Sequence, residues 1–187
     1  AAQSSSAPAA GARSDALAGG RVERYKPARV GLLGAGMMGA GIAYAQASRG
    51  IVTILQDVSI ERAELGKAYS AKLTQARVDK GRMSAQDQAA LLARITPTDK
   101  VADLRGCDLI IEAVFENREL KAKVTRDAEP QLAPGGFFAS NTSTLPISGL
   151  ALASSRPEKF IGIHFFSPVD KMQLVEIIRG QRTDDET

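Results

Sequence analysis

The chain has 187 residues, of which 44% are hydrophobic and 24% are charged, and its net charge is +3. This length and composition predict one globular domain with a proper core, alone or with a tail. The small charge and the aromatic content of 5%, without Trp, do not indicate a nucleic-acid-binding surface. No apolar run approaches membrane-spanning length. The single cysteine, Cys107, excludes an internal disulfide and fits a reducing compartment, so we expect a cytoplasmic protein.

The first 24 residues are mostly Ala, Ser, Gly and Pro, with few large apolar side chains. Such a segment cannot bury enough surface to offset the entropy that ordering would cost. No apolar stretch follows its basic residues, so it is not a secretory signal. We therefore predict a flexible linker or tail over residues 1–24 and a folded domain over residues 25–187.

A glycine fingerprint opens the predicted domain. Residues 29–57 read RVGLLGAGMMGAGIAYAQASRGIVTILQD, which is an apolar strand, Gly-x-Gly-x-x-Gly, an Ala-rich helix and a second apolar strand. Gly34 permits the tight strand-to-helix turn, Gly36 lets the backbone approach a pyrophosphate, and Gly39 lets helix and strand pack closely. Met37 and Met38 lie in the same predicted cofactor site, where the helix N-terminus offers free N–H groups to the pyrophosphate. The pattern predicts a dinucleotide-binding βαβ unit.

An acidic residue, Asp57, ends the second strand about 20 residues after the glycines. In this position a carboxylate accepts hydrogen bonds from an adenosine ribose and repels a 2′-phosphate, which predicts NAD rather than NADP. No Gly-Lys-Ser/Thr follows the glycines, so a P-loop triphosphate site is a poor candidate. A Gly-rich turn that only packs is the simpler alternative, and the agreement of strands, helix and acid disfavours it.

A helical pair is predicted next, over residues 60–80 and 85–93, with Ser59 and Ser84 as N-caps and Gly81 as the break between the helices. The pair is long for an ordinary crossover. Its basic residues could meet a phosphorylated substrate, but a solvated charged face is the favoured interpretation. These basic residues are Lys67, Lys72, Arg77, Lys80 and Arg82. A short strand is predicted at residues 95–98.

A buried strand, a helix and another strand follow. The run DLIIEAV at residues 108–114 is continuous and branched, as buried parallel strands tend to be. Cys107 lies at the amino end of this strand. Doubly wound sheets bind ligands beyond the carboxyl ends of their strands, so we predict a packing role for the Cys107 thiol. A helix over about 116–132 leads to a strand at 137–140. The polar run NTST at 141–144 is then either a ligand site or a turn.

Two apolar strands are predicted near the end, at residues 160–166 and 174–178, each with one ionisable side chain. His164 is the only histidine of the chain, and Glu176 stands alone among Leu, Val and Ile. A lone histidine on an apolar strand is more often structural, but an unpaired buried carboxylate costs several kcal/mol and should have a partner. A His164–Glu176 pair would fix one ring tautomer and leave the other nitrogen free as a base.

Several separate segments resemble one family. GLLGAGMMGAGIAYA, IIEAVFE, FFASNTSTLPI and HFFSPVDKMQLVEIIRG together closely resemble the NAD-binding domain of the L-3-hydroxyacyl-CoA dehydrogenases, over about residues 28–187. MMGAGIAY, KGRM and SPVDKM are more similar to the multifunctional fatty-acid oxidation enzymes. The resemblance implies an α/β fold with a Rossmann-like, doubly wound, mostly parallel sheet, an inserted helical pair and extra C-terminal strands. It also implies NAD as cofactor, an acyl-CoA substrate in β-oxidation, and no metal.

Site roles follow from the same resemblance. His164 would remove the proton from the 3-hydroxyl while hydride passes from C3 to NAD, and Glu176 would orient it. Ser143 would hydrogen-bond the reacting oxygen, with Asn141 beside it. The nicotinamide ribose would contact Glu116 and Lys121, and the adenosine ribose would contact Asp57.

The family continues into a helical domain that carries a catalytic Asn, acyl-chain contacts and much of the dimer interface. We therefore expect the chain to be an NAD-binding fragment of an oligomeric parent, with residues 1–24 as the linker from a preceding hydratase domain. Such a fragment should bind NAD and turn over hydroxyacyl-CoA poorly. Alternatives are a non-catalytic NAD-binding module or a related β-hydroxyacid dehydrogenase. A 6-phosphogluconate-type enzyme would use a Lys base, and a UDP-sugar dehydrogenase needs a nucleophilic Cys.

Overall fold

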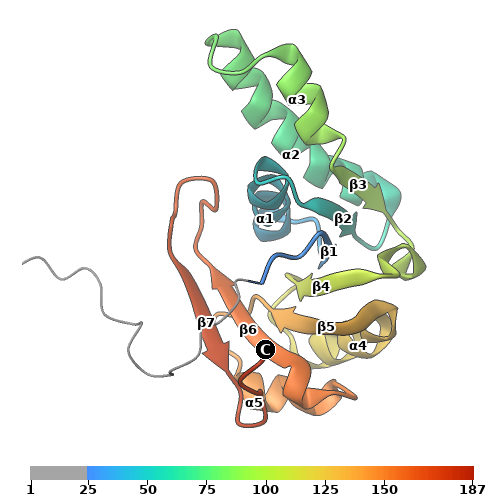
Figure 1. The fold of residues 1–187 in the computed structure, drawn as a ribbon. Coiled ribbons are helices and arrows are strands. Elements are labelled where there is room, and N and C mark those ends of the chain that lie inside the picture. Colours follow the sequence, from blue (N-terminus) through green and yellow to red (C-terminus); the bar gives the residue numbers. More distant parts are fainter. Residues whose placement is uncertain (1–24) are drawn as a thin grey trace, which may run out of the picture.

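The structure, a computed structural model, describes residues 25–187, and the predicted linker over 1–24 lies outside this part. Within it, one sheet has the strand order β3-β2-β1-β4-β5-β6-β7 (Figure 1). All neighbours are parallel except β7, which runs antiparallel to β6. The strands are β1 (Arg29–Leu33), β2 (Val52–Gln56), β3 (Ile95–Thr98), β4 (Cys107–Glu112), β5 (Leu132–Ser140), β6 (Phe160–Phe165) and β7 (Val175–Arg179).

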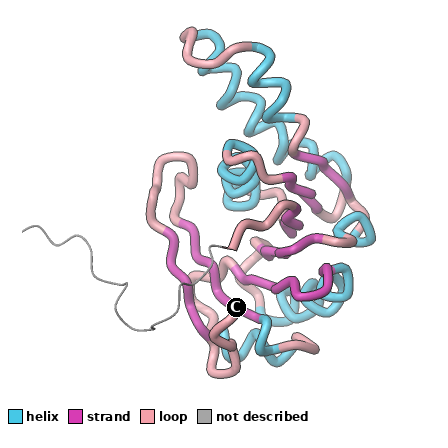
Figure 2. The backbone as a smooth tube through the Cα atoms, in the orientation of Figure 1, coloured by secondary structure: helices cyan, strands magenta, loops and turns pink. Residues whose placement is uncertain are grey.

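Helices connect these strands and lie on both sides of the sheet (Figures 1 and 2). The α-helices are α1 (Met37–Ser48), α2 (Ile60–Asp79), α3 (Ala85–Leu92), α4 (Arg118–Ala128) and α5 (Ile147–Leu150). Short 3-10 turns are η1 (Val101–Leu104), η2 (Glu129–Gln131), η3 (Ala151–Ala153) and η4 (Pro157–Lys159). In residues 25–187, no helix is both long enough and apolar enough to cross a membrane.

Helices cover both faces of the central strands, and successive side chains of a strand point to opposite faces. Leu32 of β1 belongs to a buried cluster with Ile42 of α1. Its neighbour Leu33 belongs to a second cluster, with Ala128 of α4 and Leu150 of α5. Strands covered in this way read as continuous apolar runs, which is the pattern by which the sequence predicted them.

The direction of the chain across the sheet reverses between β1 and β4. From β1 the chain continues outward to β2 and β3, and it then crosses to β4, β5 and β6 on the other side. In such folds ligands bind in the crevice outside the carboxyl ends of the strands, at this switch point. The predicted Rossmann-like, doubly wound fold is confirmed, and the extra C-terminal strands are β6 and β7.

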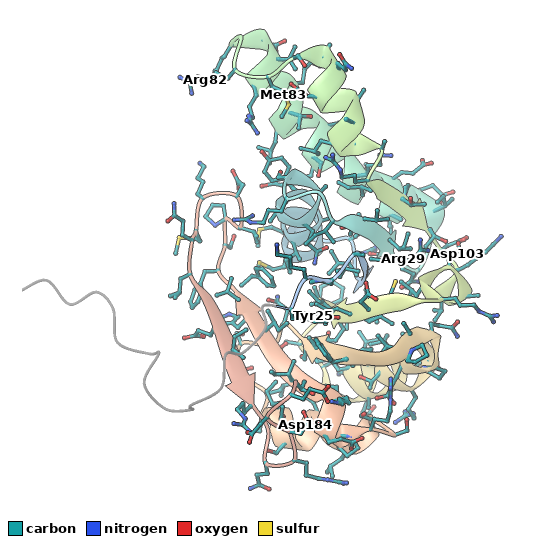
Figure 3. The ribbon with its side chains drawn as sticks, in the orientation of Figure 1. Tyr25, Arg29, Arg82, Met83, Asp103 and Asp184 are labelled. Atoms are coloured by element: carbon teal, nitrogen blue, oxygen red, sulfur yellow. The ribbon has the colours of Figure 1, made fainter. Side chains whose placement is uncertain are left out.

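The inserted helical pair is also confirmed. α2 and α3 extend away from the sheet, with Arg82 and Met83 at their far end (Figures 1 and 3). Both predicted N-caps are present: the Ser59 hydroxyl accepts from the Arg62 N–H at 3.4 Å, and the Ser84 hydroxyl accepts from the Asp87 N–H at 3.0 Å. The basic side chains at the far end are exposed, which both interpretations of this charge allow.

β5 is longer than predicted. It begins at Leu132 rather than at 137, and the preceding helix ends at Ala128 rather than near 132. Proline cannot continue a helix, and Pro130 lies in the 3-10 turn η2 that follows α4. Gly135 lies inside β5 with φ +79°, where the register with β4 shifts.

Cys107 has the packing role that the sequence predicted. It opens β4 and is fully buried in the same cluster as Leu104 and Ile110. Burial raises the pKa of its thiol. At the amino end of β4 it lies away from the carboxyl edge of the sheet.

Candidate active site

The glycine turn joins β1 to α1 with very little space. Gly34 has φ +92°, which side chains rarely allow, and a Cβ on Gly39 would lie 1.8 Å from the Gly34 carbonyl oxygen. The turn and close-packing roles predicted for these two glycines are therefore confirmed. Gly36 differs, because a Cβ there would meet no atom within 4 Å. Its role does not lie in internal packing.

The N-terminus of α1 faces the same open space. Gly36 is its N-cap residue and provides no side-chain hydrogen bond, and the first turn contains no acidic residue. The N–H groups at the start of a helix have no partners within the helix and carry the positive end of its dipole. Met37 and Met38 begin the helix here, and Met37 is exposed. This arrangement suits a diphosphate.

Asp57 lies just past β2 and connects it to the glycine turn. Its Oδ2 accepts from the Ala35 N–H at 2.7 Å, and its Oδ1 accepts from the Val58 N–H at 2.7 Å. The Arg62 Nε lies 3.1 Å from Oδ1. The carboxylate therefore holds the turn in place, and its proposed contact with a ribose stays a prediction.

A cavity of about 660 Å³ opens beside these groups. Its lining combines polar groups of the glycine turn and the end of β2 with apolar side chains from α4 and from the segment that follows β4. Among the residues that line it are Gly34, Gly36, Met37, Met38, Asp57, Arg62, Val114, Phe115, Leu120 and Val124. The glycine backbone and the uncapped helix end fit the diphosphate of NAD. The acid fits its ribose, and the apolar wall fits its adenine. Glu116 and Lys121 do not line this cavity.

His164 and Glu176 are paired as predicted. They face each other across β6 and β7, and His164 Nδ1 lies 2.8 Å from Glu176 Oε2. Among the described residues, no protein group hydrogen-bonds the other ring nitrogen, Nε2. The ring also lies against Phe166, with centroids 4.5 Å apart. The geometry is that of an oriented base, whose catalytic role stays a prediction.

One premise behind this pair was wrong. Glu176 was expected to be a buried carboxylate in need of a partner, but its side chain is 51% exposed. β7 is an edge strand, and every residue in it is exposed. An alternating or apolar pattern does not show whether a strand lies at an edge, because only the sheet order decides this.

The polar run at 141–144 is a turn organised by Glu116. Glu116 Oε1 accepts from the N–H groups of Ser143 and Thr144, at 3.2 and 3.1 Å, and from the Thr142 and Thr144 hydroxyls. The Asn141 Oδ1 accepts from the Phe165 N–H at 2.9 Å, next to His164 in the chain. The turn thus joins the carboxyl ends of β5 and β6 and presents an exposed Ser143.

Glu116 is strongly acidic in this setting. Burial alone would raise its pKa, but the Thr142 hydroxyl, the charge of Lys121 and the Thr144 N–H bring the pKa of Glu116 down to about 2. Lys121 Nζ lies 3.2 Å from Glu116 Oε2. The carboxylate that holds the turn is therefore ionised at neutral pH.

Behind Glu116 lies a buried ion pair that the sequence prediction missed. Lys121 Nζ lies 2.9 Å from both carboxylate oxygens of Glu112 and 3.2 Å from the Val114 carbonyl oxygen. The Ser140 hydroxyl donates to Glu112 Oε1. A contact between Lys121 and a nicotinamide ribose, as the resemblance implies, would require one of these bonds to open. Part of the signal was in the sequence, because Glu112 is an acid enclosed by the apolar residues of the run LIIEAV, although nothing there named Lys121 as its partner.

Comparison with known families agrees with this geometry. The family model "3-hydroxyacyl-CoA dehydrogenase, NAD binding domain" matches residues 29–187. The match includes the glycine turn, the Glu112–Lys121–Glu116 cluster, the polar turn and the His164–Glu176 pair.

Solved structures with the same fold are known. The (S)-3-hydroxybutyryl-CoA dehydrogenase PaaH1 from Ralstonia eutropha is 39% identical, with a TM-score of 0.81 over 86% of this chain and 56% of that one. The 3-hydroxybutyryl-CoA dehydrogenase from Escherichia coli is 32% identical, with a TM-score of 0.82 over 87% of this chain and 34% of that one. The dehydrogenase part of multifunctional enzyme 1 from C. elegans is 29% identical, with a TM-score of 0.73 over 85% and 36%. This chain thus spans about a third to just over a half of each of these structures.

Proposed function

The chain belongs to the NAD-binding domains of the 3-hydroxyacyl-CoA dehydrogenases, and from this premise we propose that its protein oxidises L-3-hydroxyacyl-CoA with NAD in fatty-acid β-oxidation. The observation that carries the proposal is the His164–Glu176 pair, placed at the carboxyl end of β6 and joined through Asn141 to the polar turn. A structural histidine would not need a carboxylate on one nitrogen and an unbonded second nitrogen at a ligand-binding edge.

In this proposal His164 Nε2 accepts the proton of the 3-hydroxyl. The C3–H bond breaks with its electron pair, the C3–O bond becomes a carbonyl, and bound NAD supplies the hydride acceptor. Glu176 keeps Nδ1 protonated, so that Nε2 is the basic nitrogen, and it stabilises the imidazolium that forms. One hydride and one proton leave the substrate, which balances a two-electron oxidation.

The polar turn would hold the reacting oxygen. Ser143 is exposed at the same edge, and its backbone N–H is held by Glu116. Asn141 uses its amide oxygen on the Phe165 N–H, which leaves its amide N–H₂ free to donate. We assign Ser143 to the substrate oxygen and Asn141 to the support of this turn.

We further propose that the whole protein acts on an acyl-CoA substrate, is cytoplasmic and forms an oligomer. Similarity to the dehydrogenase part of multifunctional enzyme 1 supports a multifunctional oxidation enzyme as the setting. The buried, unreactive Cys107 is compatible with a reducing compartment.

The test is turnover of the protein at its natural length with an L-3-hydroxyacyl-CoA. His164→Ala should lower kcat by roughly 10²- to 10⁴-fold, as for a lost general base, and Glu176→Gln should lower it less. Glu186→Gln is the matched control, because Glu186 is also an exposed, ion-paired carboxylate, bound to Lys159. A His164→Ala variant with normal turnover would refute the base assignment. A protein that binds NAD and turns over no hydroxyacyl-CoA would be the non-catalytic module.

A further inference from the structure

The buried cluster has two carboxylates for one ammonium. Lys121 binds Glu112 on its inner side and Glu116 on its outer side. A buried ion pair is weak evidence for stability, because desolvation of the charges can exceed their attraction. One lysine and one carboxylate would already satisfy each other, so the second carboxylate calls for another explanation.

The charge of the cluster follows from its hydrogen bonds. Glu112 receives donors only: two from Lys121 Nζ at 2.9 Å, one from the Ser140 hydroxyl and one from the Val114 N–H at 3.3 Å. Burial raises the pKa of Glu112 and outweighs the opposing effects of Lys121, the Ser140 hydroxyl and the Val114 N–H. The contacts of Lys121 Nζ with both carboxylate oxygens, each at 2.9 Å, are those of an ion pair, and we therefore assign Glu112 as ionised. Lys121 in turn faces oxygens only. With both carboxylates ionised and the lysine protonated, the cluster carries a net charge of −1.

The negative charge lies on the outer side of the cluster. The side chains of Glu112 and Lys121 are 1% and 2% exposed, whereas that of Glu116 is 36% exposed. The inner pair cancels itself, which leaves the charge of Glu116 uncompensated at the carboxyl ends of β4 and β5. Glu116 is also the group that holds the turn with Ser143.

We propose that Glu112 is a positioning residue for cofactor chemistry: by neutralising Lys121 it leaves Glu116 as a net negative charge that favours oxidised over reduced NAD. The inference rests on the proposed function, in which NAD takes hydride beside His164, and on the family resemblance, which implies that the nicotinamide ribose contacts Glu116. The oxidised nicotinamide ring is a cation and the reduced ring is neutral, so a nearby negative charge stabilises only the oxidised form. Without Glu112, Lys121 would cancel the charge of Glu116.

The experiment measures the dissociation constants of NAD⁺ and NADH for the same protein, by calorimetry, and compares their ratio among variants. In Glu112→Gln and in Glu116→Gln the ratio should shift toward NADH by roughly three- to tenfold, as for loss of one partly screened unit charge. A variant that only damaged the site would weaken the binding of NAD⁺ and NADH equally and leave the ratio unchanged. Glu129→Gln is the matched control, because Glu129 is a buried carboxylate bound to Ser154 and Ser155 at the other end of α4, and its ratio should not change.

A charge-restoring variant separates electrostatics from packing. Glu112→Gln with Lys121→Met removes one charge of each sign, leaves Glu116 at −1, and should return the ratio to that of the wild type. The inference is overturned if Glu116→Gln leaves the ratio unchanged, or if the double variant shifts it as far as Glu112→Gln does. Should Glu112→Gln fail to fold, Glu116→Gln and the double variant are each compared with the wild type: the first must shift the ratio toward NADH, and the second must leave it at the wild-type value. No acyl-CoA enters the measurement, so loss of the proposed turnover with an intact ratio shift would refute the function and not this inference.

Discussion

Gly36 and Gly39 lie three residues apart in one turn, and the structure predicts opposite consequences for the same substitution to alanine. A Cβ at Gly36 would meet no atom within 4 Å, whereas a Cβ at Gly39 would lie 1.8 Å from the Gly34 carbonyl oxygen and 2.9 Å from its carbon. Gly36→Ala should therefore fold normally and lose NAD affinity. Gly39→Ala should lose stability first.

The magnitudes follow from the local geometry. Gly36 has φ −67°, which alanine adopts freely, so the entropic gain of about 0.4–1 kcal/mol offsets the weaker helix cap. Its stability should stay within about 1 kcal/mol of the wild type. At Gly39 the clash is with the backbone of Gly34, which cannot rotate away as a side chain could, and we expect the upper end of overpacking costs, about 3 kcal/mol or more. That is a large part of the roughly 5–15 kcal/mol of a typical domain.

Two measurements on each variant suffice. Urea unfolding followed by circular dichroism gives the free energy of unfolding, and calorimetry gives the dissociation constant for NAD. Gly36→Ala should weaken NAD binding at least about tenfold, or about 1.4 kcal/mol, because the added methyl group would occupy space that the diphosphate needs beside the backbone. Wild-type NAD affinity in Gly36→Ala would refute the diphosphate site at this turn. Wild-type stability in Gly39→Ala would refute the close helix–strand contact.

Three further predictions concern other parts of the site. Asp57→Asn should lower the preference for NAD over NADP by roughly tenfold, because Arg62, 3.1 Å from Asp57 in the wild type, becomes free to bind a 2′-phosphate. Calorimetry with both cofactors tests this, and an unchanged preference would contradict it. The pKa of Glu116 is about 2 in the fold against an ordinary 4.5, so its carboxylate stabilises the fold above about pH 4.5 and this contribution is lost as the pH falls toward 2. The stability difference between wild type and Glu116→Gln, from urea unfolding at several pH values, should shrink over that range, and a constant difference would exclude this origin. A polypeptide of residues 1–187 alone should bind NAD. It should oxidise NADH with acetoacetyl-CoA on the order of 10²-fold more slowly than the protein at its natural length, since a substrate misplaced by about 1 Å loses that much rate. Equal rates would show that these residues suffice for catalysis.

What the sequence alone determined about this protein is mostly local. The glycine turn, α1 and Asp57 lie within one continuous stretch, and the requirements for each residue there come from backbone angles and helix ends. The N-caps Ser59 and Ser84 are equally local and were correct. Two lone ionisable residues on successive apolar strands predicted the pairing of His164 with Glu176, and the structure confirmed their contact. Their catalytic roles came from the family resemblance.

The tertiary structure decided what depends on the order of strands and on distant neighbours. Glu176 is exposed because β7 lies at the edge of the sheet, a fact that its apolar neighbours in the sequence cannot convey. Lysine is rarely buried, so no pattern predicted that Lys121 would lie in the interior against Glu112. Glu116 organises a turn 26 residues further along the chain, and only the pairing of β4 with β5 brings the two together. Contacts of this kind depend on folding as a whole, because each partner becomes a neighbour only after the sheet has formed.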